Sequence, residues 1–181
     1  GIIMDSTKYI IGMRTLKELQ SLPLTKEIIT LDEALSEFSG KLQFFVEVKL
    51  TKHVDIVEMA NAVGEVLRKH SQSQTIVVDS FNAFLMNSIS SRCQCVMAYD
   101  LPHKAPVTLQ LLNDARQLGA KWVYAHHHVV DKKIIQMAHS EGLKIMVYTI
   151  NTEKELMAFQ KEWPDGIMTD TLSLHKFVTS D

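Results

Sequence analysis

The chain has 181 residues, of which 46% are apolar and 22% charged, and its formal net charge is −2 at pH 7. This length fits one domain, which we predict to span residues 1–181 and to bury a hydrophobic core. The nearly neutral charge gives no support for nucleic-acid or membrane-surface binding, and no apolar run approaches the roughly 18 residues that a membrane helix needs. The first residues, GIIMDSTKY, lack the basic region and long apolar core of a signal peptide, so we expect a cytoplasmic protein.

Short apolar runs alternate with helical patterns along the chain. Runs rich in Val, Ile, Phe and Tyr predict strands buried on both faces, at residues 43–50, 75–80, 95–99, 121–126, 143–150 and 165–169. Helical patterns precede, separate and follow these runs, at residues 14–21, 31–38, 53–70, 82–90, 106–118, 131–141, 152–162 and 171–177. Such alternation implies a parallel sheet with crossover helices, and therefore the α/β class.

Several helix boundaries carry recognisable signals. Asp131 is a good N-cap, and Thr152 with Glu155 three residues later has the pattern of a capping box. Pro106 suits the first turn of its helix, and Gly119 can cap the end of the same helix. These signals support the predicted helices independently of their apolar stripes.

Two α/β architectures compete for this order of elements. A doubly wound sheet usually has a glycine-rich turn after its first strand, and this sequence has none. A barrel of eight strand–helix units typically needs about 250 residues, roughly 70 more than are present. We therefore expect an incomplete TIM-barrel-like fold of about six parallel strands, with the first two barrel strands absent.

The stretch FFVEVKL, residues 44–50, places charge inside a strand. Side chains alternate along a strand, so Phe45, Glu47 and Lys49 share one face, which would point into the barrel. The other face is wholly apolar and consists of Phe44, Val46, Val48 and Leu50. A carboxylate near the barrel mouth could hold Ca²⁺ or Mg²⁺, and the lysine could hold a phosphate. A structural ion pair between Glu47 and Lys49 is the alternative.

Other strand ends also carry polar residues. Consecutive residues on a strand point in opposite directions, so at most alternate members of His126, His127 and His128 could share a metal site; a solvated strand end is the alternative. Asp79 and Asp170 would either add carboxylates at the mouth or cap the following segment.

A cysteine pair, Cys93 and Cys95, stands at the start of the third predicted strand. The two thiols are either metal or redox ligands, or simply small residues at a strand start. No second Cys/His pair stands at zinc-finger spacing.

A series of short motifs follows a definite order along the chain: RTLKELQSLPL (14–24), IITLDEALSEF (28–38), FFVEVKL (44–50), DSFN (79–82), VYTIN (147–151) and DGIMTD (165–170). In order and spacing they resemble the glycerophosphodiester phosphodiesterases, over the later two-thirds of that family's barrel. The resemblance implies hydrolysis of a glycerophosphodiester, or of a phospholipid-derived small molecule, to an alcohol and glycerol 3-phosphate.

The same resemblance implies roles for individual residues. Glu47 would bind a divalent cation, Ca²⁺ or Mg²⁺, and Lys49 would be a catalytic residue that contacts the phosphate. The cation would polarise the phosphoryl group. The substrate pocket would include Ser80, Phe81, Tyr148 and Asn151. Tyr148 stands where the family usually has tryptophan, which keeps an aromatic wall.

The sequence also departs from the family pattern. The His-Arg-Gly, Glu-x-Asp and His-Asp motifs, which supply the family's two catalytic histidines and further metal ligands, are not found. We therefore expect this chain alone to be inactive: a short or degenerate relative, a fragment, or a chain completed by another. A non-catalytic scaffold or regulator is the alternative, and a barrel enzyme with Lys49 as Schiff-base nucleophile is a more distant one. Open sheet edges would favour a homo-oligomer or a covering partner.

Overall fold

The computed structural model of the chain describes residues 15–22, 28–50, 54–71 and 75–177. The described residues fall into two compact units. The second unit contains Phe45–Glu47, Val77–Phe81 and the described chain from Val96 onward, and the first unit contains the rest. The single domain predicted for residues 1–181 stays a prediction.

Helices make up the first unit, and local capping explains where each begins. They are α1 (Leu16–Gln20), α2 (Leu31–Glu37), α3 (Ile56–His70) and α4 (Ala83–Ser90). Thr15 and Thr30 each form a reciprocal capping box with the glutamate three residues later, so backbone donors at both helix starts are satisfied. Between α2 and α3, His70 Nε2 lies 2.6 Å from an Asp32 carboxylate oxygen, and this hydrogen bond lowers the pKa of Asp32.

A close approach between helices α3 and α4 requires the glycine in α3. A Cβ atom at Gly64 would lie 2.8 Å from the Cβ of Arg92, which follows α4. Glycine normally weakens the middle of a helix, by about 1 kcal/mol relative to alanine. Its presence at this buried position is explained by the packing, which leaves no room for a side chain.

The sheet lies in the second unit, apart from the first residues of its first two strands. Its order is β1 (Phe44–Glu47), β2 (Ile76–Asp79), β3 (Val96–Asp100), β4 (Trp122–His126), β5 (Lys144–Tyr148) and β6 (Gly166–Ile167). The ladders from β2 to β6 are parallel, and the longest, between β4 and β5, pairs Trp122 with Lys144 and His126 with Tyr148. Each strand therefore lies beside its neighbour in the sequence, as in a TIM-type barrel.

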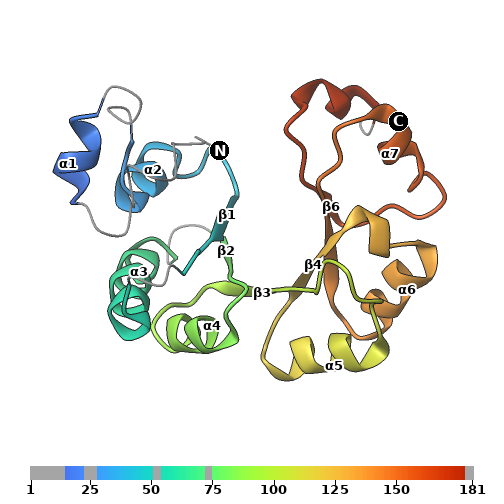
Figure 1. Cartoon of the computed structure of the whole chain (residues 1–181), viewed down its shortest axis with the longest axis horizontal. Helices are drawn as coiled ribbons and strands as arrows, with labels where there is room; N and C mark the ends of the chain where they lie inside the picture. The colour runs from blue at the N-terminus through green and yellow to red at the C-terminus, as the bar shows by residue number, and fades with distance from the viewer. Residues whose placement is uncertain (1–14, 23–27, 51–53, 72–74, 178–181) are drawn as a thin grey trace. The chain divides into compact units, whose positions relative to one another are not determined.

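Helical segments cover one face of this sheet (Figure 1). They are α5 (Leu109–Gln117), the 3₁₀ turn η2 (His127–Val129), α6 (Lys132–Ser140), α7 (Glu153–Met157) and the 3₁₀ segment η3 (Leu172–Phe177). Val123 and Ala125 of β4 and Ile145 and Val147 of β5 are fully buried in a core with these helices. The alternate residues of both strands face the other side of the sheet.

The structure confirms the α/β class and the order of predicted elements. Asp131 caps α6, and Thr152 forms a capping box with Glu155 at α7, as predicted. The prediction for Pro106 is wrong, because α5 is capped by Thr108 and begins three residues after the proline. The predicted helix starts at residues 14 and 53 lie outside the described residues. None of the helices within the described ranges has the length and hydrophobicity needed to cross a bilayer.

Candidate functional site

A pocket of about 460 Å³ lies in the second unit, on the sheet face opposite the helices. Every strand contributes to it, mostly through residues that alternate along the strand. The lining consists of Phe45, Glu47, Asp79, Phe81, Asp100, Tyr124, Met146, Tyr148, Ile167 and Met168. The pocket is therefore a property of the sheet as a whole, with an apolar floor and polar groups from particular strands.

Carboxylates from three neighbouring strands line this pocket: Glu47 on β1, Asp79 on β2 and Asp100 on β3. Burial raises the pKa of Asp100, and the charge of Glu47 raises it further. A hydrogen bond with Asp79, the charge of His103 and a hydrogen bond with Tyr148 act in the opposite direction, but burial prevails. Oxygen ligands of this kind suit Ca²⁺ and Mg²⁺, and bound cation charge would favour the ionised form of Asp100.

Aromatic rings form one wall of the pocket. Phe81 is 60% exposed and stacks on His103, with 5.4 Å between ring centroids. His103 Nε2 lies 3.2 Å from the Tyr148 hydroxyl, and burial followed by the charge of Asp100 raises the pKa of Tyr148. Tyr148 is therefore held as a neutral hydroxyl at physiological pH. This wall offers apolar surface next to hydrogen-bonding groups, a combination typical of small-molecule pockets.

The Tyr124 hydroxyl is the most informative polar atom in the pocket. It is buried, and within the described residues it has no hydrogen-bond partner. Burial raises the pKa of Tyr124, and the charges of Asp79 and Asp100 raise it further, so the hydroxyl keeps its proton. A buried donor without an acceptor costs about 1–3 kcal/mol. A ligand oxygen in the pocket would remove this cost, so the hydroxyl fits a ligand that carries an oxygen acceptor.

The structure places three predicted site residues together in the pocket, and the other predicted site residues are not among its lining. Glu47, Phe81 and Tyr148 all line the pocket. Ser80 is buried and does not line it. Lys49 is exposed beyond the end of β1 and belongs to the first unit, so its contact with phosphate stays a prediction.

Asn151 connects two segments that follow neighbouring strands. Its side-chain amide donates to a carboxylate oxygen of Asp170 at 3.0 Å, and its Oδ1 accepts from the Asp170 amide at 2.8 Å. Oδ1 also accepts from the Thr169 hydroxyl at 3.3 Å. Asn151 and Asp170 thus hold the ends of β5 and β6 together, and neither lines the pocket. Their substrate or metal roles remain predictions.

Among the residues that bring polar groups to the pocket or its border, Asp100, Tyr124 and His103 were not predicted site residues. Asp100 ends β3, so its place at a strand end was a usable signal. Tyr124 lies inside an apolar run, where nothing distinguishes a pocket-facing tyrosine from a core one. His103 lies in the loop after β3 and looks like a surface histidine in the sequence.

In the first unit, Cys93 and Cys95 are free cysteines whose thiols hydrogen-bond each other. This hydrogen bond lowers the pKa of Cys93 and raises that of Cys95. Within the described residues, the cysteines do not belong to a group of three or more possible metal ligands. A metal or redox role for the two thiols stays a prediction.

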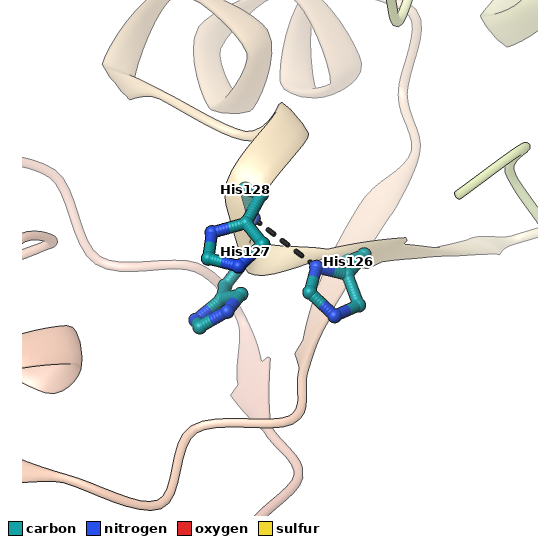
Figure 2. A group of neighbouring side chains, drawn as sticks. All are labelled: His126, His127 and His128. Atoms are coloured by element: carbon teal, nitrogen blue, oxygen red, sulfur yellow. Dashed lines mark hydrogen bonds between the residues drawn. The ribbon is translucent and has the colours of Figure 1, made fainter. Parts of the chain in front are cut away.

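The histidines after β4 differ from the expected alternation. The strand ends at His126, and the chain turns directly into η2, so His127 and His128 are not strand residues. All three rings consequently lie close to one another at the turn (Figure 2). The expectation that at most alternate members could share a site is wrong, because it extended the strand through all three residues.

Comparison with known proteins adds independent information. The model of the glycerophosphoryl diester phosphodiesterase family matches residues 6–174. No match was found among the curated proteins. Among solved structures, an Oleispira antarctica phosphodiesterase in complex with the product sn-glycerol-3-phosphate is 22% identical, with a TM-score of 0.80, covering 95% of this chain and 73% of that one.

Two further structures are similar. A glycerophosphodiester phosphodiesterase from Parabacteroides distasonis is 17% identical, with a TM-score of 0.72, covering 92% of this chain and 71% of that one. A protein of Silicibacter pomeroyi is 18% identical, with a TM-score of 0.68. The chain spans 64% of the length of the Silicibacter protein. At these identities the likeness shows the fold alone.

Proposed function

The chain belongs to the glycerophosphoryl diester phosphodiesterase family, and on this premise we propose that its pocket binds a divalent cation together with a glycerophosphodiester. The observation that carries the proposal is that Glu47, Asp79 and Asp100 line one pocket with the Tyr124 hydroxyl, which has no hydrogen-bond partner among the described residues. The Oleispira relative, solved with sn-glycerol-3-phosphate, supports a ligand that carries a glycerol phosphate.

Different pocket residues would contact different parts of the proposed ligand. Glu47, Asp79 and Asp100 would hold Ca²⁺ or Mg²⁺ after their side chains move closer together, because among the described residues only the histidines at 126–128 already form a group of three close metal-ligand atoms. The cation would supply charge stabilisation to a phosphoryl group when bound. The Tyr124 hydroxyl would donate to a ligand oxygen that lies within the pocket. Phe81 and Tyr148 would contact the apolar atoms of the glycerol or alcohol portion. Asp79 and Asp100 would thus supply oxygens that the Glu-x-Asp motif supplies elsewhere in the family.

We further propose that residues 1–181 on their own bind this ligand without hydrolysing it. Within the 181 residues no His-Arg-Gly or His-Asp motif supplies the acid and base implied by the family resemblance. His103 is hydrogen-bonded to Tyr148, which supports a role in shaping the pocket. A scaffold or regulatory protein that keeps the barrel fold is the second candidate, and it requires no ligand in the pocket.

Binding and hydrolysis can be measured on one preparation. Calorimetric titration with Ca²⁺ or Mg²⁺ should show binding that Glu47→Gln weakens by about tenfold, because one carboxylate ligand loses its charge. Incubation with a glycerophosphodiester and either cation should release no glycerol 3-phosphate above background.

The matched control is Glu153→Gln, which neutralises an exposed glutamate on α7 and should leave cation binding unchanged. Cation binding that Glu47→Gln leaves intact would remove the pocket from consideration. Release of glycerol 3-phosphate by the wild-type chain, abolished in Glu47→Gln, would show that the chain is an active hydrolase.

The two edges of the sheet support a second proposal, namely that the chain self-associates or binds a partner that covers these edges. Among the described strands, β1 and β6 each have only one neighbour. Unpaired backbone groups on such edges favour pairing with another chain. We therefore propose a homo-oligomer, for which sedimentation should give a mass above that of one chain; a strictly monomeric species over a wide concentration range would contradict it.

A further inference from the structure

The end of β4 brings three imidazole rings into contact with one another. Ring centroids lie 4.6 Å apart for His126 and His127, 4.8 Å for His126 and His128, and 4.0 Å for His127 and His128. One nitrogen from each ring can be chosen so that all three atoms lie within 4.8 Å of one another (Figure 2). Within the described residues, this is the only group of three or more histidine, cysteine or acidic side chains placed in this way.

The chemistry of this cluster differs from that of the pocket. The pocket offers carboxylate oxygens, which suit Ca²⁺ and Mg²⁺, whereas imidazole nitrogens suit Zn²⁺, Cu²⁺ and Ni²⁺. We propose that His126, His127 and His128 together bind one transition-metal ion of the zinc class, at a site separate from the carboxylates. Three protein ligands leave at least one coordination position open for water or an anion.

The geometry requires only a small contraction on binding. Ligands of one tetrahedral zinc, with Zn–N bonds of about 2.0–2.1 Å, lie about 3.3 Å apart. His126 and His127 are half-buried and His128 is exposed, so the rings can rotate towards a common point without moving core residues. His128 lies on the short turn η2, which is tethered to β4 by one side-chain hydrogen bond.

That hydrogen bond is the contact that metal binding would disturb. The His128 backbone amide donates to Nδ1 of His126 at 3.3 Å (Figure 2). Coordination through Nδ1 would displace this donor, and coordination through Nε2 would place the ring proton on Nδ1 and repel it. Either route loses one long, solvent-exposed hydrogen bond and gains a metal–nitrogen bond. The hydrogen bond between the His128 amide and His126 therefore does not prevent metal binding.

The cluster borders the pocket through His126. Its ring centroid lies 5.9 Å from that of Tyr148, which lines the pocket, and 6.1 Å from that of His103. An ion held by the three histidines would therefore add positive charge beside the pocket mouth. The inference does not depend on the function proposed for the pocket, because the ligands belong to η2 and the end of β4 and none lines the pocket.

Competition titration against a chromophoric chelator tests the site, using protein without a histidine tag. Zn²⁺ should bind in a 1:1 ratio. His127→Ala and His128→Ala should each weaken the Zn²⁺ affinity by at least about tenfold, because removing a metal ligand lowers affinity at least as much as removing a residue that hydrogen-bonds to a ligand. Millimolar Mg²⁺ should not compete. The control is His139→Ala, which removes a histidine of α6 that pairs with Asp165. It should leave the Zn²⁺ affinity unchanged.

Three further results test the proposed site. Equal Zn²⁺ affinity in the wild type and in the His127→Ala/His128→Ala double variant would overturn the proposal. So would an affinity that falls in Glu47→Gln and stays unchanged in the histidine variants, since the ion would then occupy the pocket. If the double variant does not fold, Cu²⁺ electron paramagnetic resonance on the wild-type protein settles the matter: coupling to several nitrogens supports the site, and oxygen-only coordination refutes it.

Discussion

Asp100→Asn should weaken divalent-cation binding by about 10–100-fold, which is the range found when a group that supports a metal site is lost. The same substitution should stabilise the cation-free protein at neutral pH. The two effects share one cause. Asp100 is more buried than Glu47, so its charge is less screened by water and interacts more strongly with a bound cation. The same burial makes the ionised carboxylate costly when no cation is present.

The pH dependence of stability follows from the direction of the pKa shift. Burial raises the pKa of Asp100 above its ordinary value of 3.8, so the native state binds this proton more tightly than the unfolded state. The resulting stabilisation is fully present below pH 3.8 and is lost as the pH rises through the raised native pKa. Above that pH, the cost of burying the ionised Asp100 carboxylate lowers the free energy of unfolding by its full amount. Asn carries no such charge, so the variant should lose this slope.

Urea unfolding from pH 3 to pH 8, with and without Ca²⁺, measures both effects. The gain without cation at pH 7 should be at most about 1 kcal/mol, because Asp100 is only partly buried and water screens its neighbours. Asp114→Asn on α5 is the matched control, since that carboxylate accepts a hydrogen bond from Gln110 on the same helix and does not line the pocket. Undiminished cation affinity in Asp100→Asn, or a lower stability at pH 7, would contradict the assignment of Asp100.

The fold could be predicted from the sequence because the strands are short and nearly continuously apolar. Five of the six predicted strands lie within their expected ranges, and most of their ends are one to three residues shorter, because pairing stops before hydrophobicity does. The third strand was predicted to end at residue 99 and extends one residue further, to Asp100. In FFVEVKL, alternation correctly places Phe45 and Glu47 on one side, and both line the pocket. Helix starts were less predictable when a proline and a better cap compete, as at Pro106 and Thr108.

The candidate site could be predicted only where polarity interrupts a strand. Glu47 is conspicuous in an apolar run, whereas Tyr124 reads as a core residue, because the pocket floor and the helix-packed core use the same residue types. The histidine cluster depends on the last residue of β4, and strand ends are the least certain part of a sequence-based prediction. A strand one residue longer would have separated the rings.

Ile145→Ala should lower the free energy of unfolding by about 2–5 kcal/mol, the range for truncating a buried isoleucine. Ile145 is fully buried on the helix-covered face of β5, a strand paired on both sides by β4 and β6. Its backbone amide donates to an Asp165 carboxylate oxygen at 2.9 Å, and the substitution keeps this bond. The loss therefore reports side-chain packing. Urea unfolding monitored by circular dichroism would measure it.

Tyr124→Phe, on the opposite face of the neighbouring strand, is the counterpart and should have the opposite sign. It removes a buried hydroxyl that has no partner within the described residues, so the free energy of unfolding should rise by about 1–3 kcal/mol. Affinity for the phosphodiester ligand should fall, because the ligand oxygen loses its donor. A large loss of stability in Tyr124→Phe would mean that the hydroxyl is satisfied in the native protein. If Ile145→Ala lowers the free energy of unfolding and Tyr124→Phe raises it, the helix-covered face of the sheet stabilises the fold, and the pocket face carries a polar group that suits a ligand.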